Sequence, residues 1–174
     1  MKARVMLFCG ALLAAMVGVG SDSYAANPDG YKNIKLGITQ KELEKKHPCS
    51  LTFEKSDDAG RHIQAKCEDF PFNGSKTEAI FDLIDGKLLR IYFRGGDSLT
   101  DFESIAKNIV GKYGKATFDL TYDINSFAEG RRDEIEMIWH PGIILRMWRF
   151  PRIQLVTVSY QDAKYEALRV AVRK

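Results

Sequence analysis

Two alternating strands joined by Asp85-Gly86 constrain the fold of this chain more than any other feature. Residues 78–84 and 87–94 are rich in β-branched, aromatic and leucine side chains, and the two residues between them are typical of a tight hairpin turn. A run of such hairpins predicts an antiparallel sheet, because short connections can join only antiparallel neighbours. Two short strands are predicted at residues 50–54 and 62–68. Further strands are predicted at residues 117–123, 133–139, 143–150 and 153–160.

Two segments carry the signal that starts a helix. Thr39-Gln40-Lys41-Glu42 and Thr100-Asp101-Phe102-Glu103 both have the spacing of a capping box, in which the Thr hydroxyl and the Glu carboxylate bond to free backbone N–H groups. The first predicts a short helix ended by His47-Pro48, and the second a longer helix ended by Gly114. A terminal helix is predicted within residues 161–172, and an exposed loop over residues 125–132. The predicted fold class is α+β.

The first 25 residues indicate export. Lys2 and Arg4 precede an apolar run over residues 5–20, and small and polar residues follow as far as Ala25. This is the layout of a signal peptide that is cleaved after Ala25 or Ala26, which leaves one domain over residues 26–174. An uncleaved membrane anchor is the alternative, although an apolar run of about 16 residues is short for a span. We therefore expect a periplasmic or secreted protein.

Cysteine usage agrees with an oxidising compartment. Cys9 lies inside the apolar run rather than after it, so it is not placed for lipid attachment. Cys49 and Cys67 remain in the mature chain and are expected to form one disulfide. Two alternatives use the same cysteines: a zinc site completed by His47 and His62, whose spacings match no familiar ligand pattern, and a Cys49 nucleophile activated by His47. We expect no metal and no cofactor.

The charge balance gives no reason to expect a polyanionic partner. The chain has a net charge of +3, of which the first 25 residues contribute +1, so the mature part is nearly neutral. Nucleic acid and anionic membranes are therefore not expected as main partners. A hydrophobic content of 45% argues against disorder and for a packed domain.

The two halves of the chain are similar to each other. Each has a helix-start signal, then Thr52-Phe53-Glu54 or Thr117-Phe118-Asp119, and later a related strand at residues 86–92 or 142–148. The three matches need offsets of 61, 65 and 56 residues, so gaps are required. Two explanations stay open, an internal duplication and chance similarity between amphipathic strands.

Three short motifs link the chain to a group of small exported bacterial proteins. They are Ile34-Lys35-Leu36-Gly37-Ile38-Thr39 before a short helix, Asp85-Gly86-Lys87-Leu88 in a hairpin, and Lys112-Tyr113-Gly114-Lys115 at a helix end. With these motifs, residues 31–160 resemble the superfamily that includes the β-lactamase inhibitor protein and the outer-membrane-assembly lipoprotein SmpA/BamE. The resemblance implies helices packed on one face of an antiparallel sheet, with the other face available to partners. The chain departs from the lipoprotein branch because it lacks a usable attachment cysteine.

Alternation along the strands separates an apolar face from a mixed face. The apolar face is predicted to hold Leu89, Ile91, Phe93, Ile135, Met137, Trp139, Ile143, Leu145 and Met147. The mixed face is predicted to hold Leu88, Arg90, Tyr92, Arg94, Glu134, Glu136, Ile138, Ile144, Arg146, Trp148 and Phe150.

Four residues of the mixed face are candidates for partner binding: Arg90, Tyr92, Arg146 and Trp148. Aromatic rings bury a large area, and guanidinium groups pair with carboxylates or stack on rings. We therefore expect a non-enzymatic exported binding module that recognises a protein or a cell-envelope component, as an inhibitor or an assembly accessory. In the alternative interpretation the rings cover a second small core and the arginines pair with Glu134 and Glu136.

An envelope hydrolase acting on glycans is the competing function, with Glu134 or Glu136 as the acid or base. Glycoside hydrolysis uses two carboxyl groups about 5 to 9 Å apart, but residues two apart on a strand meet that distance without any site. The sequence contains no phosphate loop, dinucleotide fingerprint, serine elbow or His-Glu zinc motif. A structural role within a larger envelope assembly is a third possibility.

Overall fold

The computed structural model describes residues 29–117, 124–139 and 142–172, so the predicted signal peptide lies outside the described residues. These residues form a two-stranded and a seven-stranded sheet with four short helices, an α+β fold. None of these helices is long and apolar enough to span a membrane. In chain order the elements are β1 (Gly30–Tyr31), β2 (Ile34–Lys35), α1 (Gln40–Lys46), β3 (Thr52–Lys55), β4 (His62–Phe72), β5 (Ser75–Ile84), β6 (Lys87–Gly96), α2 (Leu99–Tyr113), α3 (Ile124–Ala128), β7 (Glu134–Trp139), β8 (Ile143–Arg149), β9 (Gln154–Gln161) and α4 (Tyr165–Val172).

The seven-stranded sheet is antiparallel throughout, in the order β3-β4-β5-β6-β9-β8-β7. Strands β3 to β6 form one meander and β7 to β9 another, and β6 joins the two by pairing with β9. Asn73-Gly74 and Asp85-Gly86 connect β4 to β5 and β5 to β6, and all four residues have positive φ. Two-residue turns of this kind match the twist of the strands, and the hairpin predicted at Asp85-Gly86 is confirmed.

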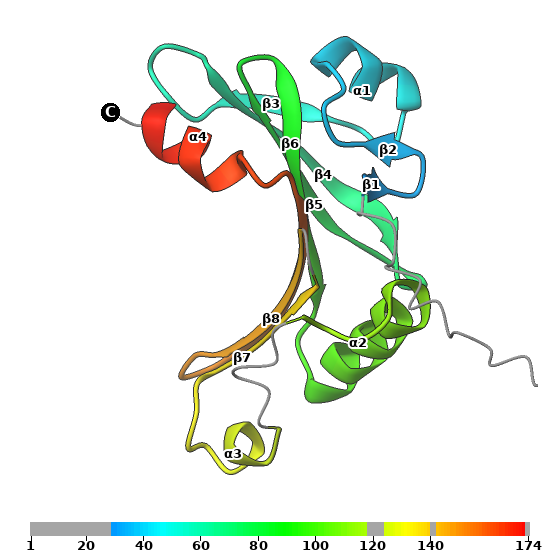
Figure 1. The fold of residues 1–174 in the computed structure, drawn as a ribbon, viewed down its shortest axis with the longest axis vertical. Helices are drawn as coiled ribbons and strands as arrows, with labels where there is room; N and C mark the ends of the chain where they lie inside the picture. The colour runs from blue at the N-terminus through cyan, green and yellow to red at the C-terminus, as the bar shows by residue number, and fades with distance from the viewer. Residues whose placement is uncertain (1–28, 118–123, 140–141, 173–174) are drawn as a thin grey trace, which may run out of the picture.

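The large sheet is curved, and α1, α2 and the β1–β2 hairpin lie on its convex side (Figure 1). Helix α4 differs, because it lies on the concave side at the end formed by β4, β5 and β6 (Figure 1). There Tyr165 is fully buried in a second apolar cluster with Ile84 and Leu89. Helices on one face alone, as the resemblance implied, therefore do not describe the whole molecule.

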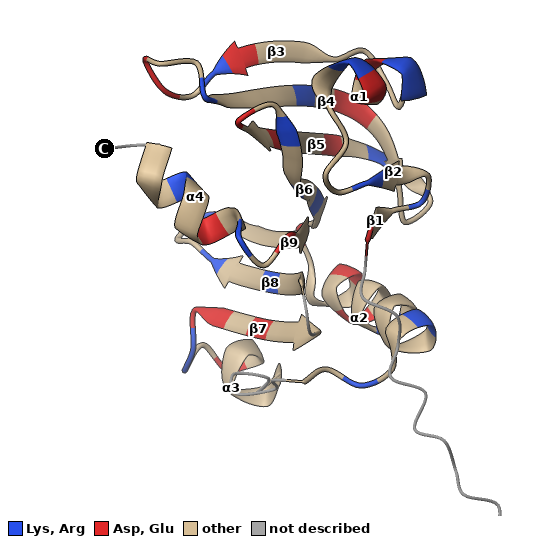
Figure 2. Ribbon diagram, turned by 45° about the horizontal axis from the view of Figure 1, so that its top comes forward, with Lys and Arg blue, Asp and Glu red and all other residues tan. Residues whose placement is uncertain are grey.

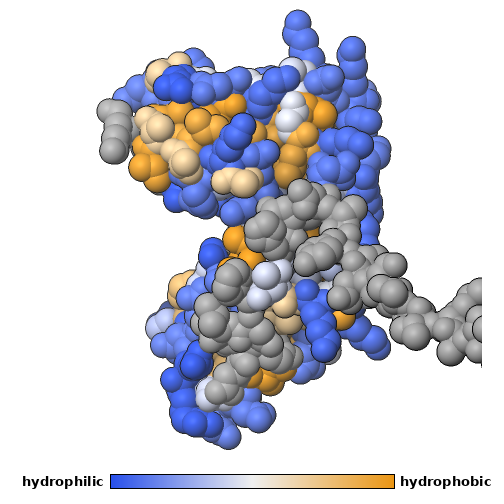
Figure 3. Space-filling model, in the orientation of Figure 1, coloured by the Kyte–Doolittle hydropathy of each residue, from blue (hydrophilic) through white to orange (hydrophobic). Residues whose placement is uncertain are grey.

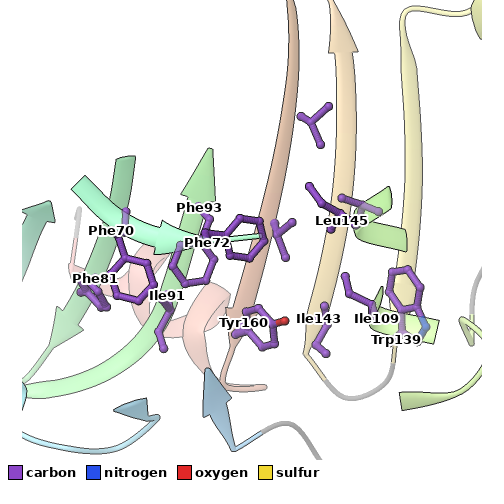
Figure 4. Packing of buried hydrophobic residues seen from close by; sticks show 14 of the residues in the cluster. Phe70, Phe72, Phe81, Ile91, Phe93, Ile109, Trp139, Ile143, Leu145 and Tyr160 are labelled. Carbon is purple, nitrogen blue, oxygen red and sulfur yellow. The ribbon is translucent and has the colours of Figure 1, made fainter. Parts of the chain in front are cut away.

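The main core lies between the convex side of the sheet and the elements that cover it (Figure 4). Helix α2 buries Phe102, Ile105 and Ile109 there, and α1 buries Leu43. All nine strand residues predicted for the apolar face are buried, and eight of them belong to this core. Fully burying a side chain of this size contributes about 1.5–3 kcal/mol relative to its exposure to water, so this layer holds the sheet and the helices together.

Leu88 and Leu89 exchange faces relative to the prediction. The register pairs Asp82 with Arg90 but Leu83 with Leu88, so Leu89 is an extra residue in β6. This irregularity turns Leu88 into the main core and Leu89 into the cluster beneath α4. Strict alternation fails at this point because a bulge shifts the period of the side chains by one residue.

Both helices predicted from a capping-box signal form, and α1 begins with the predicted capping box. Helix α2 begins with a different one, in which Ser98 is the cap and Asp101 bonds back to it. A cap residue has extended backbone, as Ser98 does with φ −133° and ψ 158°, whereas Thr100 already lies inside the helix. The capping box predicted from Thr100 and Glu103 was therefore wrong. The predicted end at Gly114 is confirmed.

Residues 125–132 are not simply the exposed loop that was predicted, because most of α3 lies within them. This helix buries Ser126 and Phe127, and the guanidinium of Arg149 lies 4.7 Å from the Phe127 ring centre. The contact with β8 is tertiary, and no local pattern signals it. Most of the strand predicted over residues 117–123, and the turn predicted around His140, lie outside the described residues.

Cys49 and Cys67 form the predicted disulfide, with their Cα atoms 6.0 Å apart. Cys49 follows α1 and Cys67 lies in β4, so the bond ties the first helix to the sheet. A bridge closing a loop of this length contributes about 3 kcal/mol in the chain-entropy description. Because both sulfur atoms are in the bond, neither can act as a thiolate ligand or nucleophile.

Candidate functional site

The concave side of the large sheet carries the residues predicted for the mixed face. Figure 3 shows the molecule hollowed between the part that carries α4 and the part that carries β7 and β8. Strand register sets out the side chains of this face in rows across the sheet. One row holds Ile80, Tyr92, Ser159, Ile144 and Ile138, the next holds Arg94, Thr157, Arg146 and Glu136, and a third holds Leu155, Trp148 and Glu134.

Arg146 and Trp148 lie together on β8. The Arg146 guanidinium is 5.9 Å from the Trp148 ring centre, within the range of a cation–π contact. Arg146 also donates from Nε to the Glu136 carboxylate, and its Nε lies 3.7 Å from Glu134 Oε1. Figure 2 shows acidic residues on β7 beside basic residues on β8. The pairing considered as the alternative for Arg146 is thus present, yet its side chain is still 39% exposed.

Tyr92 projects from β6 in the neighbouring row, opposite Ser159 of β9. It is half-buried, and burial raises the pKa of its phenol, so the hydroxyl stays neutral near pH 7. Three of the four predicted partner-binding residues therefore share the part of the concave face that α4 does not cover. They are Tyr92, Arg146 and Trp148.

Arg90 lies on the same face but at the edge of α4. Its Nε donates to Asp82 at 2.6 Å, and its guanidinium lies 4.6 Å from the ring centre of Tyr165 and 5.5 Å from that of Tyr92. Its side chain is 23% exposed. Arg90 therefore connects the predicted binding face to the buried cluster beneath the helix.

Asp82 is the centre of a buried polar network that sequence reasoning missed. Burial raises the pKa of this carboxyl, but the charge of Arg90 and the hydrogen bonds outweigh burial and hold the pKa below its usual value. The sequence did hold one signal for this network, because Asp82 is the one charged residue in the otherwise apolar run 79–84. The carboxylate bonds to His62 Nε2 (2.7 Å), Gln64 Nε2 (2.9 Å), Arg90 Nε (2.6 Å) and the Tyr165 hydroxyl (3.3 Å).

The donors of the zinc alternative are not brought together. His62 is fully buried in the network around Asp82, while Cys67 belongs to the main core on the other face. In the described part of the chain, one group of residues has its possible ligand atoms close enough together to hold a metal ion. It consists of Cys49, Cys67 and Asp69, and its two cysteines are joined in the disulfide.

A family model described as "Uncharacterised protein" matches residues 31–166. No curated protein and no solved structure matches the chain. The matched range contains the whole seven-stranded sheet, so Asp82, Tyr92, Arg146 and Trp148 all lie within it.

Proposed function

We propose that this chain, which belongs to a family described only as uncharacterised proteins, is an exported, non-enzymatic binding module. Its concave sheet face recognises a protein or another component of the cell envelope, as an inhibitor or as an assembly accessory. The observation that carries the proposal is the presence of Tyr92, Arg146 and Trp148 on one hollowed sheet face.

The composition of this face supports a protein partner. Tyrosine, tryptophan and arginine are the side chains enriched where binding energy concentrates in protein interfaces. Ile138 and Ile144, beside them in the row of Tyr92, are half-buried and still offer apolar surface. Rings and aliphatic groups on a rigid sheet lose little conformational freedom on binding, so most of their buried area contributes to affinity.

Each polar contact on the face has a role in the proposal. The carboxylates of β7 hold the direction of the Arg146 guanidinium, which leaves Trp148 as the apolar anchor. Arg90 contributes the edge of its guanidinium and, through Asp82, keeps α4 docked at the end of the face. The partner surface therefore runs from β8 to the border of α4.

Two further features support the wider proposal. The disulfide between Cys49 and Cys67 is typical of the periplasm or the cell exterior. Each half of the chain contributes a helix followed by an antiparallel meander, α1 with β3 to β6 and α2 with β7 to β9, as an internal duplication would leave. The hydrolase alternative gains no support from Glu134 and Glu136, since both contact Arg146 rather than lining an apolar site.

Affinity capture from an envelope extract tests this function. The chain beginning at Ala26, with its disulfide intact, is immobilised beside an Arg146→Ala/Trp148→Ala variant and a control variant, Lys107→Ala/Val110→Ala, altered on the exposed face of α2. Near-ultraviolet circular dichroism checks that all three are folded. We expect a partner that the unaltered chain and the control retain and the concave-face variant loses. Equal retention by all three, or retention by none, contradicts the proposal.

A further inference from the structure

A pocket on the convex side of the sheet lies away from the proposed docking face. It has a volume of about 340 Å³ and lies between β1, the turn after β4, α2 and β9. Its apolar lining comes from Phe72 and Tyr160 on the sheet, from Tyr31 on β1, and from Ile105 and Ile109 on α2. A volume of this size is within the range of small-ligand sites, which start at about 300 Å³.

The walls on the sheet side are rigid, because they belong to one aromatic cluster. The Tyr31 ring centre lies 5.4 Å from that of Tyr160, 5.6 Å from Phe72 and 4.7 Å from Phe93. Phe72 and Phe93 are stacked, with ring centres 4.6 Å apart. Because these walls are already ordered, a ligand would lose little binding free energy to the ordering of side chains.

Tyr160 is the second observation that points to a ligand. Its side chain is only 4% exposed and lines the pocket, yet among the described residues its hydroxyl has no hydrogen-bond partner. Burial raises the pKa of Tyr160, and the neighbouring phenols of Tyr113 and Tyr31 raise it further, so the hydroxyl is a neutral donor. Among the described residues, the fully enclosed side-chain atoms without a hydrogen-bond partner are His62 Nδ1 and Arg149 Nε, so the Tyr160 oxygen is accessible from the pocket. Its hydroxyl can therefore donate to a ligand acceptor or to water.

The charge of the pocket is positive. Lys32 and Lys112 line it, with Nζ atoms 5.3 Å from the Tyr31 ring centre and 4.8 Å from the Tyr113 ring centre. Among the residues that the structure describes, no carboxylate lines this pocket and neither lysine is in an ion pair. The nearby Asp29 is paired with Lys35 at 3.0 Å and interacts with Lys112 only through a weaker, longer-range charge effect. Two cations beside neutral phenols favour an anionic group at this end of a ligand.

We propose that this pocket binds a small amphipathic carboxylate, with its apolar body against Phe72 and Ile109 and its acid group between the lysines and the Tyr160 hydroxyl. One water takes about 30 Å³, so the pocket has room for about eleven non-hydrogen atoms. That size admits a single ring with a short acid chain. The proposal does not rest on the function of the concave face.

Titration followed by the backbone amide NMR signals tests the proposal, with phenylpropanoate as the ligand. Phenylpropanol and phenylpropylamine have nearly the same size and differ in charge. We expect saturable shifts in β1 and α2 with phenylpropanoate, at a dissociation constant on the order of 1 mM. Phenylpropanol should bind about fivefold more weakly, because it lacks the pairing with the lysines. Phenylpropylamine should bind more weakly still.

Two variants and a matched control separate the roles of the residues. Tyr160→Phe removes one hydroxyl and keeps the ring, and Lys112→Gln removes one charge, while Lys107→Gln alters an exposed lysine of α2 outside the pocket. Both variants should weaken phenylpropanoate about threefold to fivefold. Lys112→Gln should leave phenylpropanol unchanged, Tyr160→Phe should weaken it as well because its oxygen also accepts from the hydroxyl, and the control should change neither ligand. Equal affinity for acid and alcohol, shifts confined to the concave face, or no saturable shift overturns the proposal.

Discussion

Replacing Asp82 by Asn isolates the charge at the centre of the network beneath α4. The substitution keeps the size of the side chain and one oxygen acceptor, but it removes the negative charge that faces Arg90 at 2.6 Å. Breaking a buried ion pair by removing one partner costs about 3–5 kcal/mol, and the 23% exposure of Arg90 places this case at the lower end. We expect Asp82→Asn to lower the free energy of unfolding by about 2–4 kcal/mol.

Urea unfolding of the oxidised chain at pH 7 measures this loss. Asp85→Asn is the matched control, because Asp85 pairs with Arg61 at the surface, where both side chains are about half exposed. This control should lose much less stability than Asp82→Asn. If Asp82→Asn unfolds at the same urea concentration as the unaltered chain, the network does not hold α4 in the way we describe.

The pH dependence of the same difference has a definite sign. The pKa of Asp82 is lower in the folded chain than in the unfolded chain, so the stabilisation is fully present above the unfolded value of about 3.9. It is lost as the pH falls through the lower folded pKa. The part of the stability gap between the unaltered chain and Asp82→Asn that comes from the Asp82 charge should therefore be lost only in acid, at about pH 4 and below.

Two further predictions concern helix capping and the disulfide. Ser98→Ala should lower the free energy of unfolding by about 1 kcal/mol, because the hydroxyl caps α2 at the Asp101 N–H, whereas Thr100→Ala should change it much less. Equal losses in urea unfolding would contradict this assignment of the cap. The Cys49→Ser/Cys67→Ser chain should lose about 3 kcal/mol in the same assay, and adding a reductant should then have no further effect. A further loss on reduction would show that the stabilising effect of oxidation lies elsewhere.

The local elements of the fold could be predicted because they depend on neighbours in sequence. The hairpin at Asp85-Gly86 needs two residues that tolerate positive φ, and Asp-Gly supplies them. The burial of Ile143, Leu145 and Met147 follows from strand alternation, which assigns every second side chain to one face. The disulfide could be predicted from the cysteine count, since only Cys49 and Cys67 remain once the predicted signal peptide is set aside.

The candidate site could be predicted only in part. Strand alternation placed Tyr92, Arg146 and Trp148 on one face, but it could not order the strands, and their position relative to each other follows from the pairing of β6 with β9 and of β9 with β8. The pocket at Tyr160 was not predicted, because its walls come from segments as far apart as β1, α2 and β9.

The sequence by itself determined the strands of the large sheet, the hairpin turn at Asp85-Gly86, the capped helix α1, the disulfide and most of the division of side chains between two faces. It did not predict β1 or β2. The features that it determined depend on local geometry or on a simple count. Only the tertiary structure decided that α4 covers one end of the concave face, that Leu88 and Leu89 exchange faces, and that Asp82 is buried with Arg90 and Tyr165. The physical reason is the same in each case. A bulge or a buried charge is favourable only when residues distant in sequence supply the packing and the hydrogen bonds that compensate it.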